Sequence, residues 1–396
     1  MTNPSILNFK PLKILGKTLL PIVQGGMGIA ISAKSLAGAV AAENAVGTIA
    51  SVDLRHLHED LLRASEKTTS SDEFTKLNLI ALDREIKGAL KNSQGRGLIA
   101  VNVMKAVADY PKLVRQACES GAHVVVSGAG LPLDLPDLAK DHPTIGLIPI
   151  LSESRGIAVI LKRWMKKNRL PDAIVIENPA YAAGHLGAAK IVDLHDDRFS
   201  FRRVLEETFE LFKNLDLEKE LIPLIIAGGM SKFEKIKTAL TEWGASAVQI
   251  GTAFAVSKEG DAHINFKQVL ANARKGDITE FMSVAGLPAR GVNTQFLKNY
   301  LKREKILQGN AKADLRRCTQ GLNCLSVCGL RDGISTIGQF CIDLKLSAAF
   351  RGEVSKGLFF RGSEPLPFDN AVRSVKETIY YLLTGEKPSD LLIEGV

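Results

Sequence analysis

The sequence contains no long uninterrupted hydrophobic run. Among its 396 residues, no stretch approaches the roughly 18 to 20 consecutive apolar residues that a membrane-spanning helix requires. Its first residues also lack the ordered charged start, apolar centre and small-residue cleavage site of a secretory signal. We therefore expect a cytoplasmic protein with no membrane partner.

Cysteine is scarce and odd in number. The five cysteines, in a protein expected in the cytoplasm, argue against a disulfide framework. The paired Cys-x2-Cys knuckles usual in zinc ribbons are missing, whereas iron–sulfur spacings vary more widely. We favour buried cysteines that pack a helical tail and predict no metal, with zinc or an iron–sulfur cluster as the open alternative. The cysteines that form a local group are Cys318, Cys324, Cys328 and, beyond them, Cys341.

Aromatic residues make up only 6% of the chain and are not interleaved with its basic runs. Single-stranded nucleic acid is bound by aromatic side chains set beside basic ones, so the net charge of +8 does not indicate a nucleic-acid partner. Charge alone says little about fold or specificity. We attribute the positive net charge to a solvated surface, whose basic rim would attract anionic substrates or a phosphorylated cofactor.

Short apolar runs rich in Val and Ile recur between amphipathic segments. Strands that are apolar almost throughout are buried on both faces, as in a parallel sheet. Eight such strands alternating with helices is the count of an α/β fold of the (β/α)8 TIM-barrel type. An open doubly wound sheet is the rival, weakened because no G-x-G-x-x-G turn follows the first run. The runs cover residues 20–27, 46–51, 97–104, 122–130, 144–151, 172–179, 222–230 and 247–254.

The chain is longer than a barrel requires. We predict a barrel over residues 1–295 and, over residues 296–396, a helical cysteine-containing extension that packs on or near the barrel mouth. The segment 280–297 is expected to be a functional loop that leads into a helix. Ser32 and Ser231 are expected to cap the helices that follow the first and seventh strands.

Small residues gather where two neighbouring strands are predicted to end. "IIAGGM" (225–230) and "QIGTAF" (249–254) follow the seventh and eighth strands, and the loops after these strands commonly hold a phosphate in TIM barrels. Glycine-exposed amides at a helix N-terminus bind anions through hydrogen bonds and the helix dipole. We infer a phosphate-bearing cofactor, and flavin mononucleotide (FMN) suits a barrel of this size.

These motifs resemble those of the nitronate monooxygenase family, formerly the 2-nitropropane dioxygenases, and of the related flavin-dependent enoyl-acyl-carrier-protein reductases. Residues 20–51 are similar to the family's first strand, flavin loop and helix, and "AAGHLG" (182–187) to its Ala/Gly-Gly-His-x-Gly signature. Residues 225–254 resemble its phosphate-binding end, and "GLPARGV" (286–292) the Pro-Ala/Val-Arg segment that follows. The resemblance covers about residues 18 to 295, and the cysteine-bearing tail resembles a longer subgroup.

The resemblance implies a flavoprotein oxidoreductase that holds FMN without a covalent link. It implies one catalytic residue, His185, which falls on the family's active-site histidine. It also implies a set of residues around the cofactor. These are Gln24, Gly25, Gly26, Met27, Asn102, Gly184, Ala227, Gly228, Gly229, Gln249, Gly251 and Thr252.

His185 stands among residues too small to fill the space beside it, Ala182, Ala183, Gly184 and Gly187. Such neighbours leave room for a planar ring and a substrate above it. Imidazole, with an ordinary pKa of about 6.5, exchanges protons near neutrality. In nitronate oxidation it would take the α-proton of a nitroalkane or position the anionic nitronate; in an enoyl reductase it would polarise the thioester carbonyl.

We therefore expect an FMN-dependent nitronate monooxygenase that oxidatively denitrifies alkyl nitronates with O2. The alternative is an NAD(P)H-dependent enoyl-thioester reductase, to whose pattern "SGAGLP" (127–132) is closer. From a different class, a barrel that binds a phosphate ligand without redox chemistry is also considered. The expected partners are a small-molecule substrate and O2, and a homodimer is left open.

Overall fold

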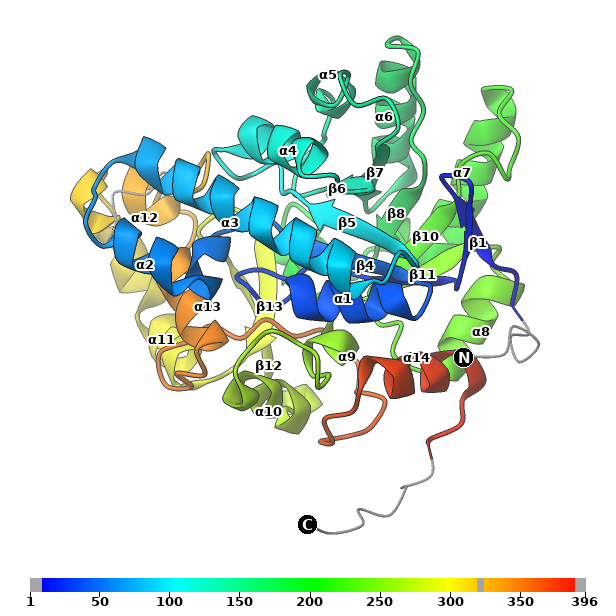
Figure 1. Cartoon of the computed structure of the whole chain (residues 1–396). Helices are drawn as coiled ribbons and strands as arrows, with labels where there is room; N and C mark the ends of the chain where they lie inside the picture. Colours follow the sequence, from blue (N-terminus) through cyan, green and yellow to red (C-terminus); the bar gives the residue numbers. More distant parts are fainter. Residues whose placement is uncertain (1–8, 319–323, 389–396) are drawn as a thin grey trace.

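Parallel strands close into a barrel at the centre of the molecule (Figure 1). The computed structural model describes residues 9–318 and 324–388. Around the barrel the strands follow the order β10-β11-β3-β4-β5-β6-β7-β8, which confirms the predicted TIM barrel, with one strand in each predicted run. Their bounds are β3 (Ile22–Gln24), β4 (Val46–Ala50), β5 (Leu98–Asn102), β6 (Val124–Ser127), β7 (Gly146–Leu151), β8 (Ile174–Glu177), β10 (Leu224–Ala227) and β11 (Ala247–Ile250).

Both faces of these strands are apolar because each is covered. Val23, Val124 and Ile225 point into the barrel and form its interior cluster, whereas Ile49 and Ile226 belong to the larger layer between the strands and the helices. Full burial on two sides explains why the strands appear in the sequence as continuous hydrophobic runs.

Helices surround the barrel and continue into the C-terminal part of the chain (Figure 1). None of the helices within the described ranges is both long and apolar enough to cross a membrane. Their bounds are α1 (Lys34–Ala42), α2 (Glu59–Ser65), α3 (Ser71–Asn92), α4 (Tyr110–Glu119), α5 (Leu135–Leu138), α6 (Ser154–Met165), α7 (Phe201–Asn214), α8 (Phe233–Thr241), α9 (Thr252–Ala255), α10 (Ile264–Asn272), α11 (Gln295–Gly309), α12 (Gly329–Asp332), α13 (Ile342–Phe350) and α14 (Val375–Thr384).

An N-terminal hairpin covers the end of the barrel where the strands begin. β1 (Leu12–Ile14) and β2 (Lys17–Leu19) pair antiparallel, and their apolar side chains join the interior cluster. The Nζ atom of Lys17 donates to the carbonyl oxygen of Gly97, just before β5, at 2.7 Å. The opposite end of the barrel, where the strands finish, is left for a ligand.

A small antiparallel sheet stands at that opposite end, in the order β12-β13-β9. It consists of β12 (Ile278–Met282), β13 (Pro288–Val292) and β9 (Gly184–His185). The expectation of a loop over 280–297 is therefore wrong, although the segment does lead into a helix, α11, as predicted. All five residues of β13 are buried, and its main-chain groups need hydrogen-bond partners, which β12 and β9 supply before α11 begins.

The chain returns to the barrel mouth after α13. Residues 358–366, which we call the strap, pass over β13: the main-chain N–H of Val292 donates to the oxygen of Phe359 at 2.8 Å, and Gly291 forms a bridge with Phe360. The division of the chain into two domains at residue 295 stays a prediction.

Candidate active site

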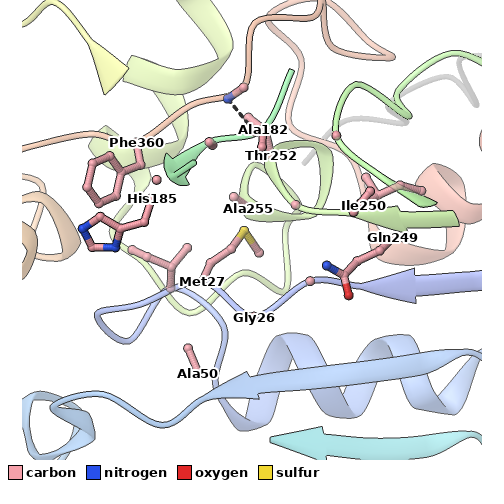
Figure 2. Close-up of a pocket in the computed structure, with 18 of the residues that line it drawn as sticks. Gly26, Met27, Ala50, Ala182, His185, Gln249, Ile250, Thr252, Ala255 and Phe360 are labelled. Atoms are coloured by element: carbon pink, nitrogen blue, oxygen red, sulfur yellow. Dashed lines mark hydrogen bonds between the residues drawn. The ribbon is translucent and has the colours of Figure 1, made fainter. Parts of the chain in front are cut away.

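A cavity of about 270 Å³ opens at the end of the barrel where the strands finish. Figure 2 shows loops from several strands converging on it, with His185 and Phe360 on one side and Gln249 and Ile250 on the other. Every residue predicted for the site lines this cavity except Gln24. Those present are Gly25, Gly26, Met27, Asn102, Gly184, His185, Ala227, Gly228, Gly229, Gln249, Gly251 and Thr252.

Gln24 lies buried beneath the cavity and joins two strands. Its Oε1 accepts from the main-chain N–H of Thr48 at 2.8 Å, and its Nε2 donates to the Thr48 oxygen at 3.1 Å. Nε2 also donates to the oxygen of Gly25. The side chain of Gln24 therefore supports the loop after β3. It was predicted to border the cofactor, but it does not line the cavity.

The loop after β3 lies directly against polar side chains. A Cβ on Gly26 would come within 2.5 Å of the Cβ of Asn102, and one on Gly25 within 3.4 Å of Gln249. The approach at Gly26 requires glycine, whereas a Cβ at Gly25 would make an ordinary contact with Gln249. The Oγ of Ser32 accepts from the N–H of Met27 in this loop at 2.8 Å, so the predicted helix cap at Ser32 is wrong: α1 begins at Lys34 without a side-chain cap.

A second glycine loop follows β10. Gly228 and Gly229 have φ angles of +100° and +69°, a region that favours glycine. A Cβ on Gly228 would lie 2.9 Å from the oxygen of Asn178, and one on Gly229 2.9 Å from the Nζ of Lys235. The main chain thus passes close to its neighbours beside a lysine, an arrangement that suits an anion.

Lys235 lies in the first turn of α8, with its Nζ 3.8 Å from the centre of the Tyr181 ring. Burial lowers its pKa from the ordinary value. The neighbouring Ser231 was predicted to cap α8, which is wrong: α8 begins at Phe233, and the Oγ of Ser231 donates to the oxygen of Pro365 in the strap at 2.7 Å.

His185 is held by its main chain in β9, where it pairs with Ala289 of β13. Burial lowers the pKa of its imidazole from 6.5 to about 4, because the charged form is poorly solvated. Its Nε2 is buried and has no hydrogen-bond partner among the described residues. The ring of Phe360 lies 5.9 Å away at 58°. At neutral pH the cavity wall therefore presents an uncharged imidazole.

Glu177, at the end of β8, is a cavity residue that was not among those predicted to be catalytic or to bind the cofactor. It lines the wall, and burial raises the pKa of its carboxyl from 4.5 to about 7. No ion pair or hydrogen bond to its side chain is found within the described ranges. Its position as the last residue of a barrel strand was the available signal, since such residues reach the mouth.

The strap belongs to the extension that was predicted to pack on or near the barrel mouth, and it forms part of the wall, although none of its residues was predicted for the site. Leu358, Phe360, Gly362, Glu364 and Leu366 line the cavity. The strap is tied to the site by hydrogen bonds at several points: the N–H of Gly362 donates to the Oγ1 of Thr252 at 3.2 Å, and the Oγ of Ser363 to the oxygen of Ala180 at 3.3 Å. A segment more than 100 residues beyond the last barrel strand thus completes the mouth.

The fold and the cavity have the form of a TIM-barrel flavin oxidoreductase. The loop at Gly228 and Gly229 beside Lys235, which we call the anion cradle, follows one of the last barrel strands, and the imidazole of His185 lies across the mouth (Figure 2). The family model for nitronate monooxygenase matches residues 10–354. The chain therefore belongs to the nitronate monooxygenase family, and it is a flavin-dependent enzyme.

Individual relatives are distant. A probable nitronate monooxygenase of Bacillus subtilis is 25% identical over 284 residues, which cover 70% of this chain and 78% of that protein. The structure of a nitroalkane oxidase from Streptomyces ansochromogenes matches with a TM-score of 0.61 at 17% identity, covering 96% of both chains. FabK from Thermotoga maritima matches with a TM-score of 0.54 at 22% identity, covering 96% of this chain and 93% of that one. At these identities the two structures support the fold alone.

The cysteines of the C-terminal part lie away from the cavity wall. The pKa of Cys324 is raised well above its ordinary value, first by burial, then by the nearby carboxyls of Asp53 and Asp343 and the thiol groups of Cys341 and Cys328. Three of the four grouped cysteines are therefore neighbours. Within the described ranges, no set of three or more His, Cys, Asp or Glu side chains is placed to hold a metal ion. Residues 319–323 lie outside those ranges, so the absence of a metal stays a prediction.

Proposed function

We propose that the protein is an FMN-dependent nitronate monooxygenase, which converts alkyl nitronates to carbonyl compounds and nitrite with O2. The observation that carries this proposal is the uncharged, buried imidazole of His185 in the cavity wall, with its Nε2 free of partners among the described residues. Family membership and the cavity's glycine-lined loops support it.

The residues of the cavity fit FMN. The amides around Gly228, Gly229 and Gly251 would take its phosphate, close to the cation of Lys235. Gly25 and Gly26 line the cavity without side chains, which would let a flat ring lie against their main chain. The side-chain amides of Asn102 and Gln249 border that surface. When bound, FMN supplies the electron transfer and the reaction with O2, while the protein orients the substrate and tunes the site.

His185 is suited to an anionic substrate. Among the residues that line the cavity there is no Lys or Arg, and the two that carry a carboxyl group are Glu177 and Glu364. His185 is therefore the residue of the wall that can become positively charged. An anion placed beside the imidazole raises its pKa and favours the charged form. We expect the ring to hold a proton when a nitronate binds, so that its charge offsets that of the nitro oxygens. Taking the α-proton from a neutral nitroalkane is less favourable for a base with a pKa of about 4.

The proposal is tested with the variant His185→Asn and propionate 3-nitronate as substrate. The variant should retain FMN and lose most turnover in air, because the amide cannot take up a proton. The matched control is His195→Asn, at an exposed histidine, which should turn over like the wild type. Near-wild-type turnover of His185→Asn would remove the histidine from the mechanism.

A second function, an NAD(P)H-dependent enoyl-thioester reductase, is favoured by the apolar part of the wall. Leu346 and Ala349 of α13, Leu358 and Leu366 of the strap and Phe266 of α10 line the cavity, and apolar walls suit an acyl chain. Rapid anaerobic bleaching of the flavin by NADH, with reoxidation by a crotonyl thioester, would favour this reductase. Fast aerobic turnover of the nitronate without NADH would favour the monooxygenase.

A further inference from the structure

Arg290 is a fully buried cation in β13 that does not line the cavity. Only 1% of the residue is exposed, yet every nitrogen of its guanidinium has a hydrogen-bond acceptor. Nη1 donates to the carbonyl oxygen of Pro179 at 3.1 Å and to that of Ala182. Nε and Nη2 donate to one carboxyl oxygen of Glu280 in β12, at 3.2 Å and 2.6 Å.

The two carbonyl groups belong to the segment that leads from β8 to His185. The ring of Tyr181 packs against Phe201, but the three residues that directly precede the histidine, Ala182, Ala183 and Gly184, have little side chain to pack. At its start, the Oδ1 of Asn178 accepts from the N–H of Ala180 at 2.9 Å. The N–H groups of Tyr181 and Ala182 donate to the oxygen of Asn178 at 3.2 and 3.1 Å, and β13 holds the end of the segment next to His185.

β13 holds this end of the segment in two ways. Its main chain pairs with β9, with Ala289 opposite His185 and Arg290 opposite Gly184, and the N–H of Leu186 donates to the oxygen of Pro288 at 2.8 Å. Its one buried cation holds the carbonyl groups upstream. The histidine is thus fixed from both sides by the same strand.

We propose that Arg290 is a positioning residue for His185: its guanidinium fixes the segment 179–182, and Glu280 fixes the guanidinium. The proposal rests on the proposed function only in assuming that His185 acts on the substrate. The planar guanidinium serves two carbonyls and a carboxylate at once, a geometry that the single ammonium of lysine cannot reproduce. When the hydrogen bonds from Arg290 are lost, the carbonyl groups of Pro179 and Ala182 bind other donors. The segment then shifts, and water reaches the imidazole of His185.

The test compares Arg290→Lys with the control Arg202→Lys, whose arginine forms an exposed ion pair with Glu206. We expect Arg290→Lys to bind FMN with an affinity close to that of the wild type while kcat on propionate 3-nitronate falls about 100-fold, since misplacing a catalytic group by about 1 Å has an effect of this size. KM should change little. The control should match the wild type in each measurement.

A second measurement separates positioning from a general loss of structure. In NMR spectra of ring-labelled histidine, with the His185 signal assigned from His185→Asn, the pKa of His185 should rise in Arg290→Lys from about 4 toward its ordinary value of about 6.5. If Arg290→Lys does not fold, Glu280→Gln keeps the arginine but weakens its anchor, and we expect about a tenfold loss of kcat with the same direction of pKa change.

An unchanged His185 pKa in a folded, FMN-binding variant would overturn the proposal, whatever happens to kcat. If the wild type does not turn over nitronates at all, the proposed function fails, but the NMR titration still decides whether Arg290 holds His185 in place.

Discussion

The burial of His185 makes the stability of the protein depend on pH in a direction that can be worked out. The folded state binds a proton on the imidazole only near pH 4, whereas the unfolded chain does so near the ordinary pKa of about 6.5. Between these values the unfolded state holds more protons, so the free energy of unfolding falls as the pH is lowered through 6.5 and levels off below 4. By this linkage the contribution of His185 at pH 5 is a loss of about 2 kcal/mol relative to pH 7.5.

The assay is urea unfolding of the FMN-free protein at pH 7.5 and pH 5, for the wild type and for His185→Asn. Asparagine does not titrate, so the wild type should lose about 2 kcal/mol more than the variant on going to pH 5. All other titrating groups are shared and cancel in the comparison. An equal loss in both proteins would show that the folded imidazole titrates like an exposed one. That result would refute the argument for an uncharged ring in the cavity.

Three further predictions concern the cradle, the buried carboxyl and the cysteines. Gly229→Ala should weaken FMN binding at least about tenfold in a fluorescence titration, because alanine is strained at a φ of +69° by roughly 1–2 kcal/mol. The control variant is Gly276→Ala, where a Cβ meets nothing within 4 Å, and it should bind FMN normally. Glu177→Gln should stabilise the protein increasingly as the pH rises from 5 to 8. The folded-state pKa of Glu177, about 7, lies above its ordinary value, so the wild type must ionise a buried carboxyl in this range. A stability difference between the two proteins that does not change with pH in thermal melts would contradict this. Protein purified without air should contain no stoichiometric metal, and stoichiometric iron or zinc in elemental analysis would overturn that expectation.

The barrel was predictable from the sequence because burial on both faces leaves continuous apolar runs that any reader of the chain can locate. The starts of helices α1 and α8 were not predicted correctly, because the caps expected at Ser32 and Ser231 do not form. The hydroxyl of Ser32 is engaged by the loop at Met27, and that of Ser231 by Pro365, 134 residues away. Local sequence indicates a capping residue but does not show a tertiary partner that competes for the same oxygen.

The site was predictable where it is made of loops that follow strands, and less so elsewhere. Gln24 was predicted to border the cofactor from the family resemblance, but its side chain bonds to Thr48, and the sequence does not reveal this hydrogen-bond partner. Phe360 was missed because nothing near it in the chain resembles a barrel element. Arg290 lay within a recognised motif, yet its contacts with the carbonyls before His185 depend on the pairing of β13 with β9.

The family match ends at residue 354, and the strap begins only at residue 358. The matched portion of the chain thus includes the loops predicted to bind the cofactor, while the strap beside His185 follows it and is tied back to those loops through Thr252 and Ser231. A change in the strap therefore reaches both the side of the pocket next to His185 and the loops after the last barrel strands. Exchanging this stretch between relatives would show how far substrate preference and cofactor binding depend on each other.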